Sequence, residues 1–114
     1  MELQNIFIKR ILERKGLSEF DVKVLLEAKK LRLGEVASYK QIAERIGMPN
    51  AYRAVGNALK KNPLPIIIPC HRVVGCKGIG GYKYGKAAKK LLLFIESNLK
   101  KIQYIATESP SSNT

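Results

Sequence analysis

The sequence predicts a mostly α-helical, compact domain. It contains a helix-turn-helix of the winged-helix-like kind and at most a short β-hairpin. Three observations carry this prediction. Apolar residues recur at helical spacing over most of the chain, and two short helical stretches, 39–46 and 51–61, are separated by the turn Met48-Pro49-Asn50. At 114 residues the chain has room for one domain, which we place at residues 1–104, with 105–114 as a disordered tail.

Capping signals mark where the helices begin and end. A first helix ends at Gly16, and a second opens at Ser18, which stands three residues before Asp21 as in a capping box. We expect Gly34 to stop the second helix and Ser38 to cap the third. The apolar positions of the first two helices are Ile6, Ile8, Ile11 and Leu12, then Val22, Val24, Leu25 and Ala28.

A glycine-rich segment, 75–85, precedes the last helix. It has five glycines in eleven residues but lacks the Gly-Lys-Ser/Thr ending of a phosphate-binding loop, so it predicts a mobile loop that shapes a pocket. The last helix, 86–99, has a broad apolar face made of Ala87, Ala88, Leu91, Leu92, Ile95 and Leu99.

The net charge of +12 comes from 21 Lys and Arg against 9 Asp and Glu. This excess favours a polyanionic partner, and nucleic acid is the leading candidate. A solvated Lys-rich surface, as thermophilic proteins have, explains the charge alone equally well. No apolar stretch is long enough to span a membrane and the first fifteen residues lack a signal-peptide apolar block, so we expect no membrane association and a cytoplasmic location.

The pentapeptide Pro69-Cys70-His71-Arg72-Val73 follows the most apolar run of the chain, 64–68. A thiol beside an imidazole and an arginine has the ingredients of an activated nucleophile, because basic neighbours increase the thiolate population. A buried, inert cysteine is the alternative. With one histidine and only Cys76 besides Cys70, the chain has no four-ligand zinc set, and we expect neither a metal nor another cofactor. Cys76 is expected to be an ordinary loop residue.

The helix predicted at 51–61 is rich in small residues and includes Arg53. Small side chains allow a backbone to approach a ligand or groove closely, and Gly56 lowers helix stability by roughly 1 kcal/mol, which suggests a reason for its presence. The pattern is typical of a DNA-contacting helix. Taken alone, the segment fits equally well a helix that packs against another helix through Ala51, Ala54, Val55 and Ala58.

From Phe20 to Glu96 the chain resembles the C-terminal, catalytic domain of the O(6)-alkylguanine-DNA alkyltransferases, also called methylated-DNA-protein-cysteine methyltransferases. Several motifs in consistent order carry the resemblance. They are Gly34-Glu35-Val36-Ala37-Ser38-Tyr39 with Gln41-Ile42-Ala43, Arg53-Ala54-Val55-Gly56, Asn62-Pro63, the Ile-Pro-Cys-His-Arg-Val-Val block ending at Val74, Gly81-Tyr82, Lys89 and Glu96.

The resemblance implies a direct, stoichiometric transfer. The sulfur of Cys70 attacks the alkyl carbon on guanine O(6), and because the alkylated cysteine is not regenerated, one molecule repairs one lesion. His71 takes the thiol proton through a water, and Glu96 orients the imidazole. Cys70 as a structural residue, His71 as a satisfied core histidine and Glu96 as a surface acid are the alternatives.

The resemblance also implies how DNA is bound. The helix lies in the minor groove of duplex DNA, and the target base is flipped into a pocket. Arg53 fills the vacated space, Tyr39 donates a hydrogen bond to guanine N(3), and Asn62 is a hinge between the helix-turn-helix and the cysteine segment. Tyr39 as a core aromatic and Asn62 as a helix-terminal residue are the alternatives. The other implied DNA or base contacts come from Ser38, Ala51, Ala54, Gly56 and Tyr82 and from main-chain groups of Cys70, Val73 and Lys83.

Two departures from the family pattern stand out. The family usually carries an N-terminal domain, whereas about nineteen residues precede Phe20 here, so we expect a minimal catalytic domain, monomeric, or one separated from its partner domain. Lys83 replaces the small polar residue common in the family. Two other functions stay open: an alkyltransferase-like protein that binds damage without transfer, and a basic helix-turn-helix regulator that binds a specific operator.

Overall fold

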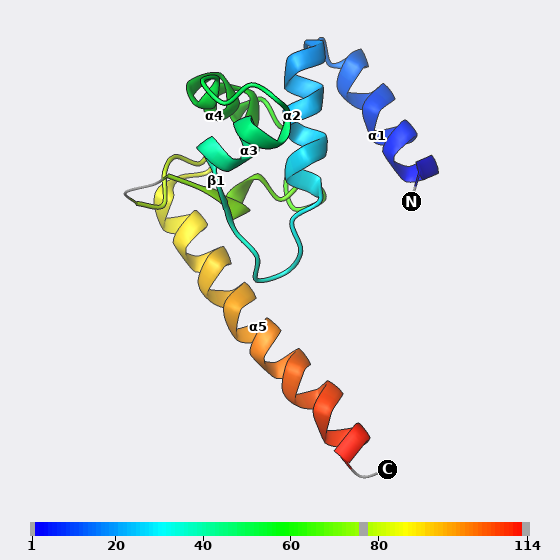
Figure 1. Ribbon diagram of the computed structural model, residues 1–114, viewed down its shortest axis with the longest axis vertical. Helices are drawn as coiled ribbons and strands as arrows, with labels where there is room; N and C mark the ends of the chain where they lie inside the picture. Colours follow the sequence, from blue (N-terminus) through cyan, green and yellow to red (C-terminus); the bar gives the residue numbers. More distant parts are fainter. Residues whose placement is uncertain (1, 76–77, 113–114) are drawn as a thin grey trace.

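The computed structural model describes the backbone of residues 2–75 and 78–112 and the side chains of residues 3–75 and 78–101. Within this part the chain is mostly helical, which confirms the predicted fold class (Figure 1). The elements in chain order are α1 Glu2–Arg14, α2 Glu19–Lys29, β1 Ala37–Ser38, α3 Tyr39–Arg45, α4 Tyr52–Lys60, the 3₁₀ turn η1 Cys70–Arg72, β2 Val73–Val74 and α5 Lys86–Ser112.

The two strands correct one detail of the prediction. β1 and β2 pair in parallel, with Ala37 opposite Val73 and Ser38 opposite Val74, so they do not form a hairpin. Parallel strands need a crossover connection, and here α3 and α4 lie between the two strands along the chain. The pair therefore joins the start of the helix-turn-helix to the segment that follows Cys70.

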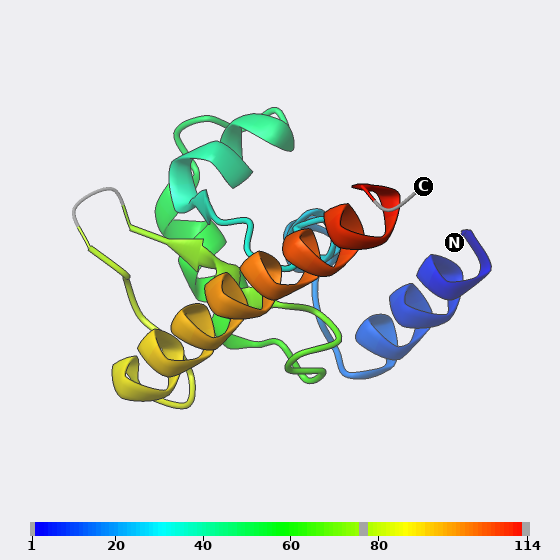
Figure 2. The same cartoon turned by 90° about the horizontal axis from the view of Figure 1, so that it is seen from below.

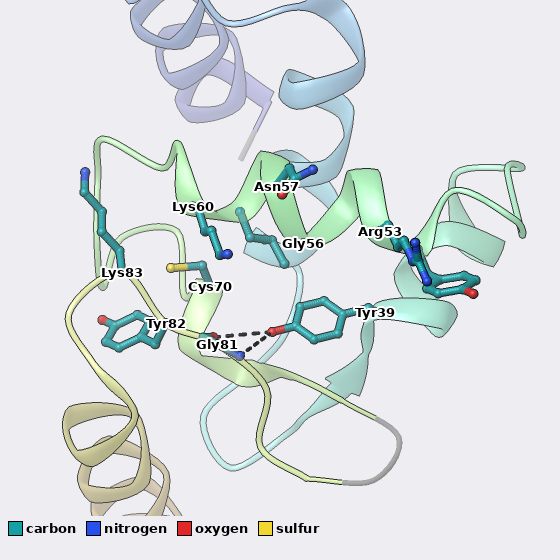
Figure 3. A pocket seen from close by; sticks show the side chains of 11 residues that line it. Tyr39, Arg53, Gly56, Asn57, Lys60, Cys70, Gly81, Tyr82 and Lys83 are labelled. Carbon is teal, nitrogen blue, oxygen red and sulfur yellow. Dashed lines mark hydrogen bonds between the residues drawn. The ribbon is translucent and has the colours of Figure 1, made fainter.

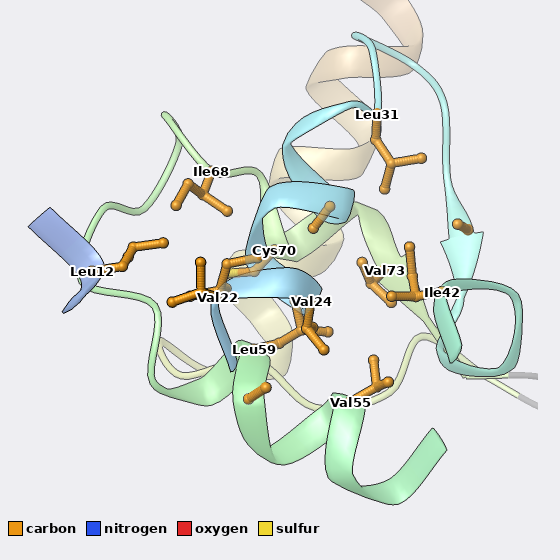
Figure 4. Close-up of a cluster of buried hydrophobic side chains, with 14 of the residues drawn as sticks. Leu12, Val22, Val24, Leu31, Ile42, Val55, Leu59, Ile68, Cys70 and Val73 are labelled. Atoms are coloured by element: carbon orange, nitrogen blue, oxygen red, sulfur yellow. The ribbon is translucent and has the colours of Figure 1, made fainter. Parts of the chain in front are cut away.

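The core forms around α2, which packs against α1, α3, α4 and η1. Both views place α1 and the α3–α4 pair on opposite sides of α2 (Figures 1 and 2). Cys70 belongs to the same buried cluster and lies among its apolar side chains (Figure 4). Fully buried members of the cluster include Leu12, Val24, Leu25, Ala28, Ile42, Ala43, Val55, Ala58, Ile68 and Val73.

Capping boxes begin α2 and α3, at the two N-caps that the sequence predicts, Ser18 and Ser38. The Ser18 hydroxyl accepts from the Asp21 amide at 3.1 Å, and the Asp21 carboxylate accepts from the Ser18 amide at 3.2 Å. Ser38 and Gln41 repeat the arrangement at the start of α3. Asp21 also accepts from Lys61 at 3.1 Å. Burial alone would raise the pKa of Asp21, but the bonds from Lys61 and Ser18 outweigh it and hold this pKa below its ordinary value.

The helix-turn-helix prediction is confirmed in its placement. α3 packs on α4, and the turn between them includes Gly47, whose φ of +79° a glycine adopts without strain. α4 begins at Tyr52, and the N-cap residue Ala51 supplies no side-chain hydrogen bond. α2 ends at Lys29, before Gly34.

The faces of α1 and α5 differ from the predicted ones. In α1, Ile8 is buried while Ile6 and Ile11 are exposed. In α5 the predicted apolar residues Leu91, Ile95 and Leu99 are exposed, and the buried face carries Lys89 and Glu96. Helical periodicity identifies an apolar stripe but not what covers it, and here two polar side chains with specific partners point inward.

α5 continues to Ser112, past Leu99, where the sequence predicts the end of the last helix, and into the segment 105–114. The side chains of residues 102–114 lie outside the described part, so the disordered tail stays a prediction. Cys76, expected to be an ordinary loop residue, also lies outside the described residues. No described helix is both long enough and apolar enough to cross a membrane.

Candidate functional site

The segment that leads to Cys70 is held by Asn62, directly after α4. The Asn62 side-chain amide donates to the Ile68 carbonyl at 2.8 Å, and its oxygen accepts from the Leu64 amide at 2.9 Å. Between these two anchors Ile66 has a φ of +74°, a conformation that costs free energy in a β-branched residue. Asn62 is buried, so its two bonds fix the path of the chain from α4 to the cysteine.

Cys70 opens the 3₁₀ turn η1. Its exposed fraction is 6%, but it lines a pocket of about 410 Å³ that also reaches α4 (Figure 3). Cys70 therefore borders this pocket, although most of the residue is buried. The pocket is lined by Tyr39, Tyr52, Arg53, Gly56, Asn57, Leu59, Lys60, Cys70, Gly81, Tyr82 and Lys83.

His71 and Glu96 form a buried pair next to the cysteine. The His71 Nε2 lies 2.7 Å from the Glu96 Oε2, and an ionised carboxylate at this distance places the ring proton on Nε2. The His71 Nδ1 is then an acceptor, and it is buried without a hydrogen-bond partner among the described residues. An unpaired buried acceptor is costly in a purely structural histidine, whereas it suits one that receives a proton.

Arg72 completes this arrangement. Its guanidinium donates to both Glu96 oxygens, at 2.8 and 2.9 Å, and to the Leu31 carbonyl at 2.8 Å. Burial alone would raise the pKa of Glu96, but the hydrogen bonds from Arg72 and His71 outweigh it, so the pKa of Glu96 lies below its ordinary value. Glu96 is therefore a carboxylate at neutral pH.

The phenol of Tyr39 also lines the pocket and contacts the glycine-rich segment at Gly81. Its hydroxyl accepts from the Gly81 amide at 3.1 Å and donates to the Gly81 carbonyl at 3.3 Å (Figure 3). Burial raises the pKa of Tyr39, so the phenol stays a proton donor. A Cβ at Gly80, where φ is +77°, would overlap the Tyr39 hydroxyl, so this contact requires glycine.

Lys89 of α5 lies behind Tyr39 and is fully buried. Its ammonium donates to the Val73 carbonyl at 2.5 Å and the Gly81 carbonyl at 2.9 Å, and it stands 5.6 Å from the centre of the Tyr39 ring. Burial lowers the pKa of Lys89 to about 8. Lys89 therefore joins β2, the glycine-rich segment and α5 at the base of the site.

The structure brings together most of the predicted site residues. Cys70, Tyr39, Arg53, Gly56, Tyr82 and Lys83 line the pocket, and His71, Glu96 and Asn62 support it from the buried side. Ser38, Ala51, Ala54 and Val73 are not among the lining residues. Ser38 caps α3, Ala51 precedes α4, and the Val73 carbonyl already has Lys89 as a partner.

Three residues of this region have contacts that the sequence analysis did not predict. Arg72 clamps Glu96, Lys89 bonds two carbonyls, and Lys60 lines the pocket. Arg72 directly follows His71 in sequence, which was the only signal of its position. Lys89 was among the residues that carry the family resemblance, but without an expected contact, and Lys60 could not be separated from the many solvated lysines of this chain by sequence alone.

The fold and the site define a helix-turn-helix domain whose second helix borders a pocket with a cysteine, and whose histidine–carboxylate pair lies behind that cysteine. The family model described as "6-O-methylguanine DNA methyltransferase, DNA binding domain" matches residues 19–98. The chain belongs to this family.

Curated relatives carry the name methylated-DNA–protein-cysteine methyltransferase. The protein of Methanocaldococcus vulcanius is 49% identical over 88 residues, which are 77% of this chain and 53% of that protein. The protein of Metallosphaera sedula is 46% identical over 92 residues, 81% of this chain and 58% of the relative. The chain thus spans about half the length of the curated relatives it matches.

Solved structures agree with this assignment. The Mycobacterium tuberculosis OGT in complex with DNA has a TM-score of 0.70 and 42% identity, covering 72% of this chain and 51% of that one. The Schizosaccharomyces pombe Atl1, solved with damaged DNA containing O6-carboxymethylguanine, has a TM-score of 0.63 and 32% identity, covering 70% of this chain and 77% of that one.

Proposed function

We propose that this chain repairs DNA by transferring an alkyl group from O(6) of guanine to Cys70, once per molecule. The observation that carries the proposal is Cys70 itself, at the end of a pocket bordered by α4 and backed by the His71–Glu96 pair. Family membership and relatives named as methyltransferases support the same activity. The positive net charge of +12 suits a DNA partner.

The proton path begins at Cys70. In the proposed mechanism a water bridges the thiol and the His71 Nδ1, which is the unpaired buried acceptor of the site. The thiol proton passes to His71, and Glu96 and Arg72 hold the imidazole and balance its new charge. The thiolate then attacks the alkyl carbon, an S–C bond forms, the C–O(6) bond breaks and the electron pair leaves with guanine.

The remaining groups act on the base and the duplex. In our proposal Tyr39 leaves its Gly81 contacts and donates to guanine N(3), where negative charge develops. Arg53, exposed on α4, fills the space of the flipped base. Gly56 supports close approach of DNA, because a Cβ there would meet only the Tyr39 ring, at 3.9 Å. Packing within the described part of the chain therefore does not require glycine at this position.

A non-catalytic damage-binding protein is the second candidate. The likeness to Atl1 favours it, since this chain covers more of Atl1 than of the other neighbours cited above. The cysteine in the pocket, with its histidine and carboxylate, favours transfer. The two candidates differ in whether the protein gains mass.

The deciding experiment is intact-mass measurement after incubation with a duplex that contains O(6)-methylguanine. We expect the chain to gain one methyl group, located on Cys70 by peptide mapping, and the Cys76→Ala control to gain it as well. Cys70→Ala is expected to bind the duplex without gaining mass. Binding without mass gain by the unaltered chain would support the damage-binding alternative instead, and loss of binding by folded Cys70→Ala would assign the cysteine a structural role.

A further inference from the structure

The pocket beside Cys70 is lined by cations without a compensating acid. Lys60, Lys83 and Arg53 are among its eleven lining residues, and none of the eleven is Asp or Glu. Figure 3 shows Lys60 and Lys83 at the Cys70 end of the pocket, while Arg53 lies at the other end, beyond Tyr39. The carboxylate behind Cys70, Glu96, is already bonded to His71 and Arg72.

Lys60 and Lys83 form no ion pair within the described residues, so their ammonium groups are available to bind an anionic group. The adjacent Lys61, by contrast, is paired with Asp21 at 3.1 Å. The Lys83 ammonium lies 5.7 Å from the centre of the exposed Tyr84 ring. Both side chains are exposed and line the same pocket as Cys70.

We propose that Lys83 and Lys60 make this pocket selective for O(6)-guanine adducts whose alkyl group carries a negative charge, of which carboxymethyl is the simplest. The inference rests on the proposed function. The Cys70 thiolate attacks the methylene carbon, the S–C bond forms and the C–O(6) bond breaks. Guanine recovers its proton, which balances the one lost by the thiol, and S-carboxymethylcysteine remains.

The physical basis of this selectivity is the negative charge of the carboxylate, which a neutral carboxamide lacks. A carboxylate bound between two ammonium groups gains charge-assisted hydrogen bonds, while a carboxamide of the same size gains only neutral ones. Because both lysines are partly solvated, the gain is that of exposed ion pairs, a few-fold for each lysine. A phosphate contact by the same lysines would instead affect every DNA substrate equally.

The test compares single-turnover transfer from duplexes containing O(6)-carboxymethylguanine and the isosteric, neutral O(6)-carboxamidomethylguanine, followed by intact mass. The ratio of the two rates is compared between the unaltered chain and each variant, so that the intrinsic reactivity of the substrates cancels. We expect Lys83→Gln to lower the ratio about fivefold. The double variant Lys60→Gln/Lys83→Gln should lower it further. Lys83→Arg, which keeps the positive charge, should keep the ratio of the unaltered chain. The matched control is Lys90→Gln, an exposed lysine of α5 outside the pocket, which should leave the ratio unchanged.

An unchanged ratio in the double variant, with methyl transfer still present, would overturn the selectivity and leave the proposed function intact. Equal slowing of both substrates would assign the lysines to phosphate contact and would also overturn it. Absence of methyl transfer from O(6)-methylguanine by the unaltered chain would overturn the proposed function, and this inference with it.

Discussion

Two side chains, Arg72 and His71, converge on the Glu96 carboxylate. Arg72 holds both oxygens of Glu96, and Glu96 holds the Nε2 of His71. The imidazole can then present only Nδ1 as an acceptor. The planar guanidinium of an arginine fixes the orientation of a carboxylate through two hydrogen bonds, which a lysine ammonium does less well. We therefore assign Arg72 a positioning role.

Replacing Glu96 tests the electrostatics at this residue. The pKa of Glu96 is lowered below 4.5 in the folded chain, so the folded state binds fewer protons than the unfolded state around that pH. Glu96 therefore contributes stability that is complete above about pH 5 and is lost as the pH falls through the folded pKa. We expect the difference in unfolding free energy between the unaltered chain and Glu96→Gln to be constant above this pH and to shrink below it.

Urea denaturation at a series of pH values measures this difference, and the subtraction removes the titration of the other acids. A difference that stayed constant down to about pH 3 would mean that Glu96 is not held as a carboxylate by its partners. His71→Gln at the same pH values provides the companion measurement, because it removes one donor to Glu96 and leaves Arg72 in place.

The element that closes the site is the segment between β2 and α5. Its Gly81 backbone holds the Tyr39 hydroxyl, and Lys89 of α5 holds the Gly81 carbonyl from behind. The segment thus links α3 to α5 through single backbone groups. In the proposed mechanism Tyr39 leaves Gly81 to reach a bound base. The strength of the Tyr39–Gly81 contact should therefore influence the rate of alkyl transfer.

A pair of glycine substitutions tests the fit of this segment. Gly80→Ala forces a positive φ on alanine and places its Cβ against the Tyr39 hydroxyl, so we expect a loss of about 1–2 kcal/mol in unfolding free energy and slower methyl transfer. Gly78→Ala is the matched control, since no atom lies within 4 Å of a Cβ built there. Equal behaviour of the two variants in denaturation and transfer assays would contradict the tight contact with Tyr39.

At the scale of the whole molecule, the net charge determines how binding to the proposed DNA partner depends on salt. α1 to α4 form one cluster from which α5 extends (Figure 1). The net charge of +12 makes binding to a polyanion depend on ionic strength, because each neutralised phosphate releases counterions.

Salt titration measures the number of phosphates that the chain neutralises. If it contacts four or five, the slope of the logarithm of the association constant against the logarithm of salt concentration is about −4, at roughly 0.9 per phosphate. Fluorescence anisotropy with undamaged duplexes of unrelated sequence should give the same slope for each. A strong preference for one sequence would favour the regulator hypothesis, and a slope near zero would exclude a phosphate-dominated interface.

The sequence predicted the helical class, the helix-turn-helix and most pocket residues, since these depend on local signals and ordered motifs. It did not predict the parallel strand pair, and of the buried face of α5 the family resemblance implied only Glu96. Both depend on contacts between distant segments: Arg72 meets Glu96 across 24 positions and Leu31 across 41. Apolar periodicity alone favoured the opposite face of α5, because it takes no account of a lysine and a glutamate with buried partners.

The sequence by itself determined where α2 and α3 begin and which side chains are available for chemistry. A capping box closes within three residues, so no distant segment is needed to form it. Only the tertiary structure decided that Cys70 lines a pocket, that His71 Nδ1 has no partner among the described residues and that two lysines line the same pocket. These properties depend on burial and on the direction of side chains, which arise when remote elements pack together.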